Sequence, residues 1–431
     1  MKKKDTSILQ RKKAPPIVDA VNFNLQLKPY QKLTLKNNVD VYTVDAGTED
    51  VLAIEWVFFA GNSYEEKNLV AASANFLLKN GTSNKTAFQI NEHFDYYGSF
   101  LNRSCYNETA TISLHSLTKH IGELLPVVRE MISDSIMPEE ELSIYQQNMK
   151  QKLRVSLKKS DFVASRLIDV YLFGENHPYG KFSRAEDFDA LKREELITFY
   201  KKYYQQGKLI IFAAGRLPAN LEQLLNDSFG DLPNNSNLPI PAVTSPSAEK
   251  KFRVINDESG VQGSIRLARP FPNRHHPDFQ KVQVLNTLFG GFFGSRLMVN
   301  IREDKGYTYG IHSYLQAHVH ESAWMVSTEA GREVCEAAIS EVYKEMKDLR
   351  EELVEEDELL LVRNFLMGGI LGDLDGPFHI IARWKNIILN DLEHDHFYKT
   401  IDTIKSVSAI ELQSLAQKYL NPDDFYDLVV V

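Results

Sequence analysis

The sequence predicts an α+β protein made of two similar domains, each a mainly antiparallel sheet packed against several helices. Three observations lead to this prediction. The composition, 43% hydrophobic and 25% charged over 431 residues, is that of a globular chain long enough for more than one core. A stretch rich in Pro, Asn and Ser divides the chain near its middle. The same order of strands and helices recurs on both sides of that stretch.

The order of elements follows from the hydrophobic patterns of the two halves. The first half is expected to contain a strand at 51–58, helices near 69–79 and 87–97, a long strand region at 100–117, several helices over 119–205 and a closing strand at 209–212. The second half repeats this order with a strand at 264–267, helices near 277–289 and 295–304, a strand region at 307–327, helices over 333–420 and a closing strand at 426–431. Within the last helical region, apolar residues recur as on one buried helix face: Val334, Ala338, Val342, Met346 and Leu349.

Four segments follow from this pattern. We expect a basic N-terminal arm at 1–19, a first domain at 20–232, a linker at 233–250 and a second domain at 251–431. No apolar stretch follows the basic start, as a secretory signal requires, although a surface-docking arm or a trimmed export signal remains an alternative. No apolar run is long enough to cross a bilayer. The prediction is a cytoplasmic protein, or a periplasmic one if an export signal was removed.

Charge and cysteine content exclude several classes of function. The net charge of −9 argues against a nucleic-acid binder with a broad basic face. The two cysteines, Cys105 and Cys335, lie far apart in the sequence and offer neither a disulfide framework nor a thiolate metal site.

Two stretches carry a family resemblance. The first is Phe59-Ala60-Gly61-Asn62-Ser63-Tyr64-Glu65-Glu66, which precedes a helix ending at Gly81-Thr82. The second runs from Gly290-Gly291 through Ser295-Arg296-Leu297 to Gly306-Tyr307-Thr308-Tyr309. Together they resemble the pitrilysin/insulinase family of zinc peptidases, and most closely its bacterial two-domain branch akin to the mitochondrial processing peptidase. The resemblance covers residues 20 to 431 and implies two homologous peptidase-like domains.

The zinc motif of that family is missing. Active members carry H-x-x-E-H on the helix before Gly81-Thr82, where two His bind zinc and the Glu activates its water. Counting back from that Gly-Thr, the three positions hold Ala72, Asn75 and Phe76. A methyl group, an amide and a benzene ring neither ligate zinc nor take a proton from water. No H-x-x-E-H occurs elsewhere in the chain.

The third zinc ligand of the family is missing as well. It is a Glu on a later helix and would fall near Gln151 or Lys152. The stretch 145–160 contains no carboxylate and several Lys and Arg residues. We therefore predict no catalytic residue, metal ion or other cofactor in this chain.

The second half keeps a different part of the family's machinery. The family has an Arg and a Tyr seven residues apart that reach the substrate beside the zinc, and Arg302 and Tyr309 match that spacing. We expect Arg302 in the last turns of a helix, Gly306 as the left-handed residue after it and Tyr309 at the start of a strand. A guanidinium and a phenol aimed at one point can hold a peptide carbonyl and stabilise an oxyanion. A surface Arg and a half-buried strand Tyr are the alternative.

A further family position on the substrate side matches Asn102. Without a metal beside it, an ordinary turn or strand Asn is the simpler interpretation.

The resemblance implies a non-catalytic subunit of a heterodimeric zinc metalloendopeptidase. A homologous subunit with the zinc motif would carry the zinc, and the peptide would bind as an added β-strand. One alternative is a structural scaffold of the kind found in respiratory membrane complexes. Another is an active hydrolase with unusual ligands, drawn from His318 and His320 or from His394 and His396. Neither His pair has a third ligand nearby, so we expect these histidines to be exposed to solvent.

Overall fold

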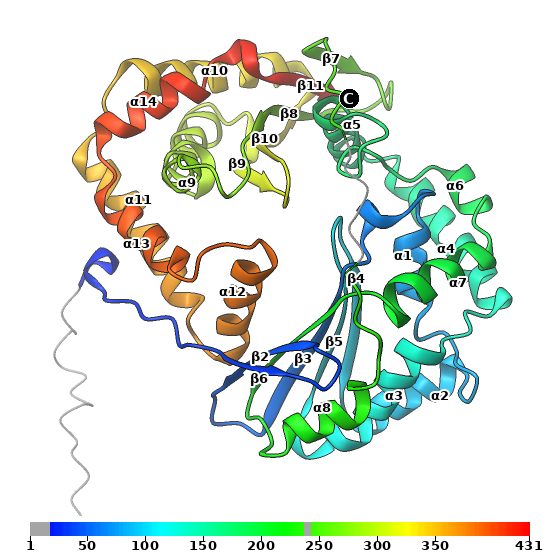
Figure 1. Ribbon diagram of the computed structural model, residues 1–431. Coiled ribbons are helices and arrows are strands. Elements are labelled where there is room, and N and C mark those ends of the chain that lie inside the picture. The colour runs from blue at the N-terminus through cyan, green and yellow to red at the C-terminus, as the bar shows by residue number, and fades with distance from the viewer. Residues whose placement is uncertain (1–17, 237–242) are drawn as a thin grey trace, which may run out of the picture.

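Two sheets, one in each half of the chain, form the framework of the protein (Figure 1). The computed structural model describes residues 18–236 and 243–431. The first sheet has the order β1-β2-β6-β3-β5-β4 and the second has the order β7-β11-β8-β10-β9. The strands are β1 (Gln31–Thr34), β2 (Asp40–Asp45), β3 (Val51–Phe58), β4 (Phe100–Cys105), β5 (Ala110–Leu117), β6 (Leu209–Gly215), β7 (Lys251–Val254), β8 (Gln262–Phe271), β9 (Thr308–Ala317), β10 (Ser322–Gly331) and β11 (Tyr426–Val430).

The sheets are mainly antiparallel, which confirms the predicted fold class. Only β2–β6 and β7–β11 are parallel pairs among the described strands. Most of the predicted arm at 1–19 and part of the predicted linker lie outside the described residues. No described helix is long and apolar enough to span a membrane.

The two sheets share one topology. Strands β2 to β6 of the first sheet take the same places, in chain order, as β7 to β11 of the second. Strand β1 is an addition to the first sheet. This equivalence places β4 and β9 at corresponding free edges, one in each half.

Helices cover both sheets. The first half contributes α1 (Val70–Leu77), α2 (Ala87–Tyr96), α3 (Ile121–Asp134), α4 (Glu139–Ser156), α5 (Ser160–Phe173), α6 (Ala185–Asp189), α7 (Arg193–Tyr200) and α8 (Leu221–Phe229). The second half contributes α9 (Phe279–Asn286), α10 (Cys335–Glu351), α11 (Glu356–Gly372), α12 (Pro377–Leu389), α13 (His396–Ser406) and α14 (Ala409–Tyr419). Of the residues predicted for one buried helix face, Ala338, Val342, Met346 and Leu349 lie on α10 and are buried. Val334 lies just before this helix and is half-buried.

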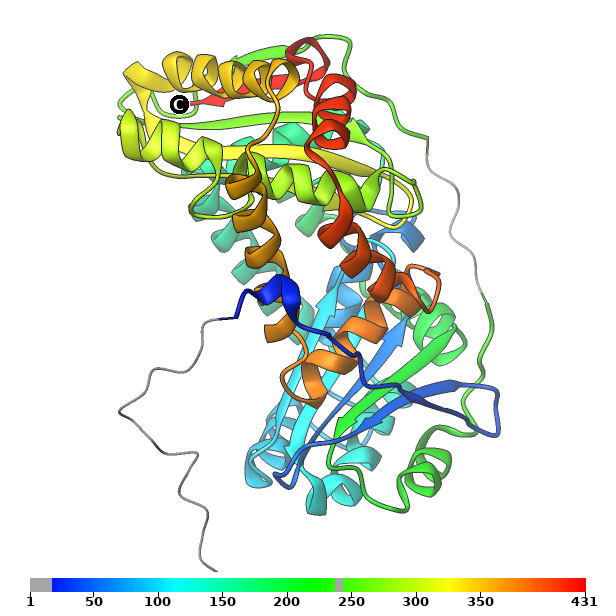
Figure 2. The same ribbon diagram turned by 90° about the vertical axis from the view of Figure 1, so that its left-hand side faces the viewer.

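Each half lends one helix to the sheet of the other half. Helix α5 packs on β8 and β11 of the second sheet, and α12 packs on β6 and β2 of the first (Figures 1 and 2). The apolar face of α12 includes Trp384, whose indole Nε1 donates a hydrogen bond of 2.8 Å to the Lys28 carbonyl. Because helices cover both faces of the first sheet, every residue of β6 is buried. This explains why β6 is apolar without alternation.

The sequence pattern missed the elements with the weakest signals. Strands β1, β2 and β7 and helix α8 were not predicted, and the region 100–117 is a hairpin of β4 and β5 rather than one strand. Strands β1 and β7 have four residues each, too few for a clear pattern. They are held in place by pairing with β2 and β11, partners that are distant or undetected in the sequence.

Candidate functional site

The helix that would carry the zinc motif is present and is fixed at its start by a buried carboxylate. Glu65 accepts hydrogen bonds from the backbone amides of Ala71 (2.8 Å) and Leu69 (3.3 Å) at the beginning of α1. Its side chain also pairs with Lys181 at 2.6 Å. A carboxylate at a helix N-terminus accepts hydrogen bonds from the free amides there and interacts favourably with the positive end of the helix dipole. The motif positions are therefore held on a rigid helix.

The three motif positions differ in burial, and Phe76 is exposed. Asn75 is buried and its amide Nδ2 donates a hydrogen bond of 3.1 Å to the Tyr204 hydroxyl. Ala72 is half-buried and has no ligand atom. The ring of Phe76 lies 4.7 Å from that of Tyr145 on α4, measured between centroids.

Arginine and tyrosine side chains complete this cluster, and the sequence analysis did not predict them. The Arg103 guanidinium lies over the Phe76 ring, 5.1 Å from its centroid, and its Nη1 donates to the Phe76 carbonyl. Burial lowers the pKa of Arg103 to about 10 and raises that of Tyr204. Arg103 lies beside Phe76 because β4 packs against α1. The sequence pattern does not encode this contact, so it gave no signal for Arg103.

These residues do not fit a zinc ion. Zinc needs Cys, His, Asp or Glu ligands, and none stands at the motif positions. On α4, Gln151 and Lys152 are exposed, whereas the neighbouring Leu153 is buried. Arg103 places a positive charge over Phe76, one of the motif positions. Nor does the described part of the chain contain any group of three or more His, Cys, Asp or Glu that could hold a metal.

Arg302 and Tyr309 take the local positions expected of them. Arg302 lies in the helical turn Met298–Asp304, Gly306 has φ +66° and Tyr309 is the second residue of β9. The Arg302 guanidinium lies 4.6 Å from the centroid of the Phe293 ring. The Tyr309 side chain is 93% exposed. Within the described residues neither side chain makes a hydrogen bond, and no contact joins them, so both are available to a ligand.

Asn102 lies on the corresponding strand of the other half. It is exposed on β4 and pairs in register with Ser113 of β5. Because β4 and β9 are both edge strands, each has one side without a partner strand. The topology thus puts Asn102 and Tyr309 on equivalent free edges, one per half.

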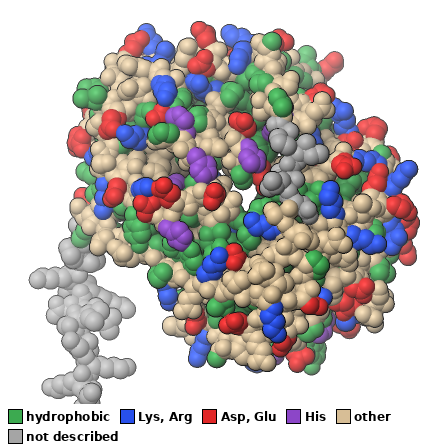
Figure 3. Space-filling model, in the orientation of Figure 1, with side chains coloured by type: hydrophobic (Ala, Val, Ile, Leu, Met, Phe, Trp, Pro, Cys, Tyr) green, Lys and Arg blue, Asp and Glu red, His purple; other side chains and the backbone are tan. Residues whose placement is uncertain are grey.

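The tips of these two hairpins meet. Asn107, in the β4–β5 turn, lies 3.2 Å from the Nδ1 atom of His318, in the β9–β10 turn. The His318 ring stacks on Tyr179 at 4.0 Å between centroids. Residues of both turns line a cavity of about 660 Å³ between the halves, in the region where Figure 3 shows a hollow.

Two of the histidines expected to be exposed are not. His318 is half-buried, and burial lowers its pKa to about 4. His396 is half-buried as well, with its pKa lowered by burial. His320 and His394 are exposed, as predicted. The predictions failed where turns from distant parts of the chain pack over an imidazole.

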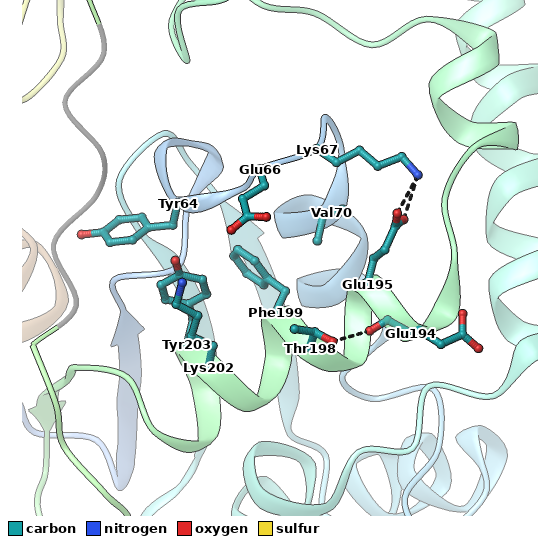
Figure 4. Close-up of a pocket in the computed structure, with 10 residues that line it drawn as sticks. All are labelled: Tyr64, Glu66, Lys67, Val70, Glu194, Glu195, Thr198, Phe199, Lys202 and Tyr203. Carbon is teal, nitrogen blue, oxygen red and sulfur yellow. Dashed lines mark hydrogen bonds and ion pairs between the residues drawn. The ribbon is translucent and has the colours of Figure 1, made fainter.

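A second pocket, of about 330 Å³, lies beside the start of α1 (Figure 4). Val70 and Phe199 form its apolar wall, and a 2.8 Å ion pair between Lys67 and Glu195 closes one side. Burial raises the pKa of Tyr64 at its other end to about 12. A lysine and a carboxylate that neutralise each other leave no activated nucleophile here.

Comparison with known proteins agrees with this geometry. Residues 190–366 match the family model described as "Peptidase M16 inactive domain". This match identifies residues 190–366 as a domain of the M16 (pitrilysin/insulinase) peptidase family. An uncharacterized zinc protease of Rickettsia felis is 24% identical over 81% of this chain and 83% of its own length. A Helicobacter pylori protein named "Non-peptidase homolog YmxG" is 23% identical over 73% of this chain and 74% of its own.

Solved structures share the fold of this chain. A Pseudomonas fluorescens protein, described as a peptidase M16 inactive domain, superposes with a TM-score of 0.83 at 21% identity, covering 93% of this chain and 98% of that one. A chain of Complex III2 from Candida albicans has a TM-score of 0.74 at 13% identity, with 93% and 95% covered. The missing zinc motif and the match to the inactive domain support a non-catalytic member of the family.

Proposed function

We propose that this chain is the non-catalytic subunit of a heterodimeric zinc endopeptidase and binds an extended peptide for a homologous subunit that carries zinc. One observation carries the proposal. The zinc-motif positions of helix α1 hold Ala72, Asn75 and Phe76. Within the described residues Arg302 and Tyr309 make no hydrogen bond or ion pair, and they lie beside a free sheet edge.

The edge strand β9 suits an extended peptide. A peptide added to a sheet edge gains main-chain hydrogen bonds whatever its sequence, and alternate side chains supply selectivity. Tyr309 lies at the beginning of this strand, and Arg302 lies in the helical turn just before it. The guanidinium and the phenol are donors for a carbonyl oxygen, which becomes more negative when water attacks it.

The test reconstitutes this chain with a homologue from the same cell that carries H-x-x-E-H, and measures cleavage of a quenched fluorescent peptide. We expect the pair to cleave and this chain alone to be inactive. Arg302→Ala or Tyr309→Phe should lower kcat/KM of the pair by about 10²–10³-fold, as the loss of one oxyanion donor does. Complex formation on size-exclusion chromatography should be unchanged.

A matched control is Tyr314→Phe, a half-exposed tyrosine farther along the same strand. It should leave kcat/KM unchanged. Full activity of the zinc-bearing homologue without this chain would refute the proposal, and so would unaltered kinetics in both the Arg302 and Tyr309 variants.

One observation favours a second function, a structural scaffold. The Candida albicans chain that shares this fold belongs to Complex III2. Under this alternative the chain would copurify with a membrane assembly and the Arg302 and Tyr309 variants would have no phenotype. Affinity purification of the tagged chain from its own cells separates the two functions.

A further inference from the structure

A polar pocket of about 370 Å³ lies in the second half, apart from both sheet edges. Its walls come from the turn before α9 and from helices α9, α12 and α13. The lining side chains are rich in hydrogen-bond donors: Arg274, Gln283, His379, Arg383, His396 and Thr400. Figure 3 shows histidine side chains gathered on this half of the molecule, beside the hollow.

Arg274 is the unusual member of this set. Its guanidinium is half-buried, and its Nε atom is fully buried with no hydrogen-bond partner. No ion pair or hydrogen bond of its side chain occurs in the described part of the chain; its one ring contact is with Phe279, at 5.7 Å. Burial lowers the pKa of Arg274, and no carboxylate opposes the effect. An unpaired buried charge is costly, and native proteins rarely keep one without a reason.

A second guanidinium lines the same pocket and is only partly satisfied. Arg383 pairs through Nη2 with Asp373, but its Nε atom is buried without a partner. Asp373 is the only carboxylate in the lining, so two guanidiniums face one negative charge. The pocket therefore carries excess positive charge.

His396 is placed to add a donor. Its Nδ1 atom lies 3.3 Å from the Gln280 amide Nε2, and an imidazole that accepts there as a neutral ring carries its proton on Nε2. Burial lowers the pKa of His396, and the charges of Arg274 and Arg383 act in the same direction, against the opposing charge of Asp395. Arg274, Arg383 and His396 all line this one pocket.

We propose that this pocket binds a phosphate group, held by Arg274 and Arg383 with His396. Guanidinium groups match phosphate with paired N–H donors. The terminal nitrogens of Arg274 make no hydrogen bond within the described residues, and Arg383 uses only Nη2 for Asp373, so both groups keep donors for a phosphate. A carboxylate has only two oxygens and one negative charge, so it would leave more of these donors unpaired than a phosphate would. Arg274 also lines the larger cavity between the halves, so a phosphate ester has room to extend there.

The test is thermal unfolding of the full chain with inorganic phosphate, O-phosphoserine or acetate at equal ionic strength. A ligand that binds only the folded state raises Tm as its concentration increases. We expect both phosphate compounds to raise Tm with saturation and acetate to have no effect. The relative affinity for phosphate and phosphoserine tells whether the free anion or an ester fits better.

Two variants locate the site. Arg274→Gln should weaken phosphate binding at least tenfold, measured by titration calorimetry. Without phosphate this variant should unfold at the same or a higher temperature than the parent, because it removes an unpaired buried charge. A loss of stability would instead assign Arg274 a structural role and overturn the proposal. Arg274→Lys keeps the charge but not the paired donors, and should also bind more weakly.

The matched control is Arg216→Gln, an exposed arginine paired with Asp50 in the other half. It should bind phosphate as the parent does. Equal Tm shifts for the parent and Arg274→Gln, or equal shifts with acetate and phosphate, would refute the proposal. The outcome does not depend on peptidase activity.

Discussion

A half-buried aspartate where the two halves join should make this protein less stable as the pH rises. Asp169 lies on α5, the helix that the first half packs against the second sheet. Its Oδ1 atom accepts a hydrogen bond of 3.2 Å from Gln316 of β9. Burial raises the pKa of Asp169 from 3.8 to about 7, against smaller opposing effects from Gln316 and Arg266. Tyr314 and Asp161 also lie near this cluster.

The sign of the effect follows from linkage. Between about pH 4 and pH 7 the folded chain holds a proton on Asp169 that the unfolded chain has released, so the free energy of unfolding falls as the pH rises. A shift of about 3 units corresponds to about 4 kcal/mol as an upper bound. Because water reaches part of this carboxylate, we expect about 2 kcal/mol.

The perturbation is Asp169→Asn, which keeps the oxygen that accepts from Gln316 but cannot ionise. Urea unfolding should show a gain over the parent of less than about 1 kcal/mol at pH 5 and of about 2 kcal/mol at pH 8, because most of the titration window lies between these pH values. Asp161→Asn on the same helix is the control, since Asp161 pairs with the buried Arg266. Loss of that partner should destabilise the chain at both pH values by about 2 kcal/mol. An Asp169→Asn effect that is the same at the two pH values would refute the reasoning.

Two further predictions concern the fold and the helix with the zinc-motif positions. Tyr204→Phe removes the acceptor of the buried Asn75 amide and should lower the free energy of unfolding by about 1–3 kcal/mol, measured by urea unfolding; no change would mean that the amide finds another partner. Trp384→Ala should cost about 3–5 kcal/mol, because it leaves a cavity between α12 and the first sheet and frees the Lys28 carbonyl. The exposed Ala382→Ser on the same helix is its control, and equal stability of the two variants would show that α12 does not hold the halves together.

Much of the fold could be predicted because its signals are local. The apolar run of β3, the periodicity of α10 and the repeated order of elements each lie within one stretch of chain. The positions of Gly306 and Tyr309 were predictable for the same reason. A left-handed residue after a helical turn and the start of a strand are both local features. The short strands β1 and β7 were missed because pairing with other strands, rather than their own pattern, defines them.

The candidate sites show the same division. The absence of the zinc motif at Ala72, Asn75 and Phe76 is a property of the sequence. The side chains that surround these positions could not be read from the sequence. Arg103, Tyr145 and Tyr204 come from three separate elements: β4, α4 and the turn after α7. The half-buried state of His318 and His396 was mispredicted for the same reason.

The sequence by itself determined the doubled α+β architecture, the absence of an H-x-x-E-H motif and the seven-residue spacing of Arg302 and Tyr309. Only the tertiary structure decided that α5 and α12 cross to the opposite sheets and that β4 and β9 are free edges. It also decided that Arg274 has no counter-ion among the residues described. The physical reason is that periodicity and motifs record the preferences of neighbouring residues. Burial, edge position and charge pairing depend on segments hundreds of residues apart, which only folding brings together.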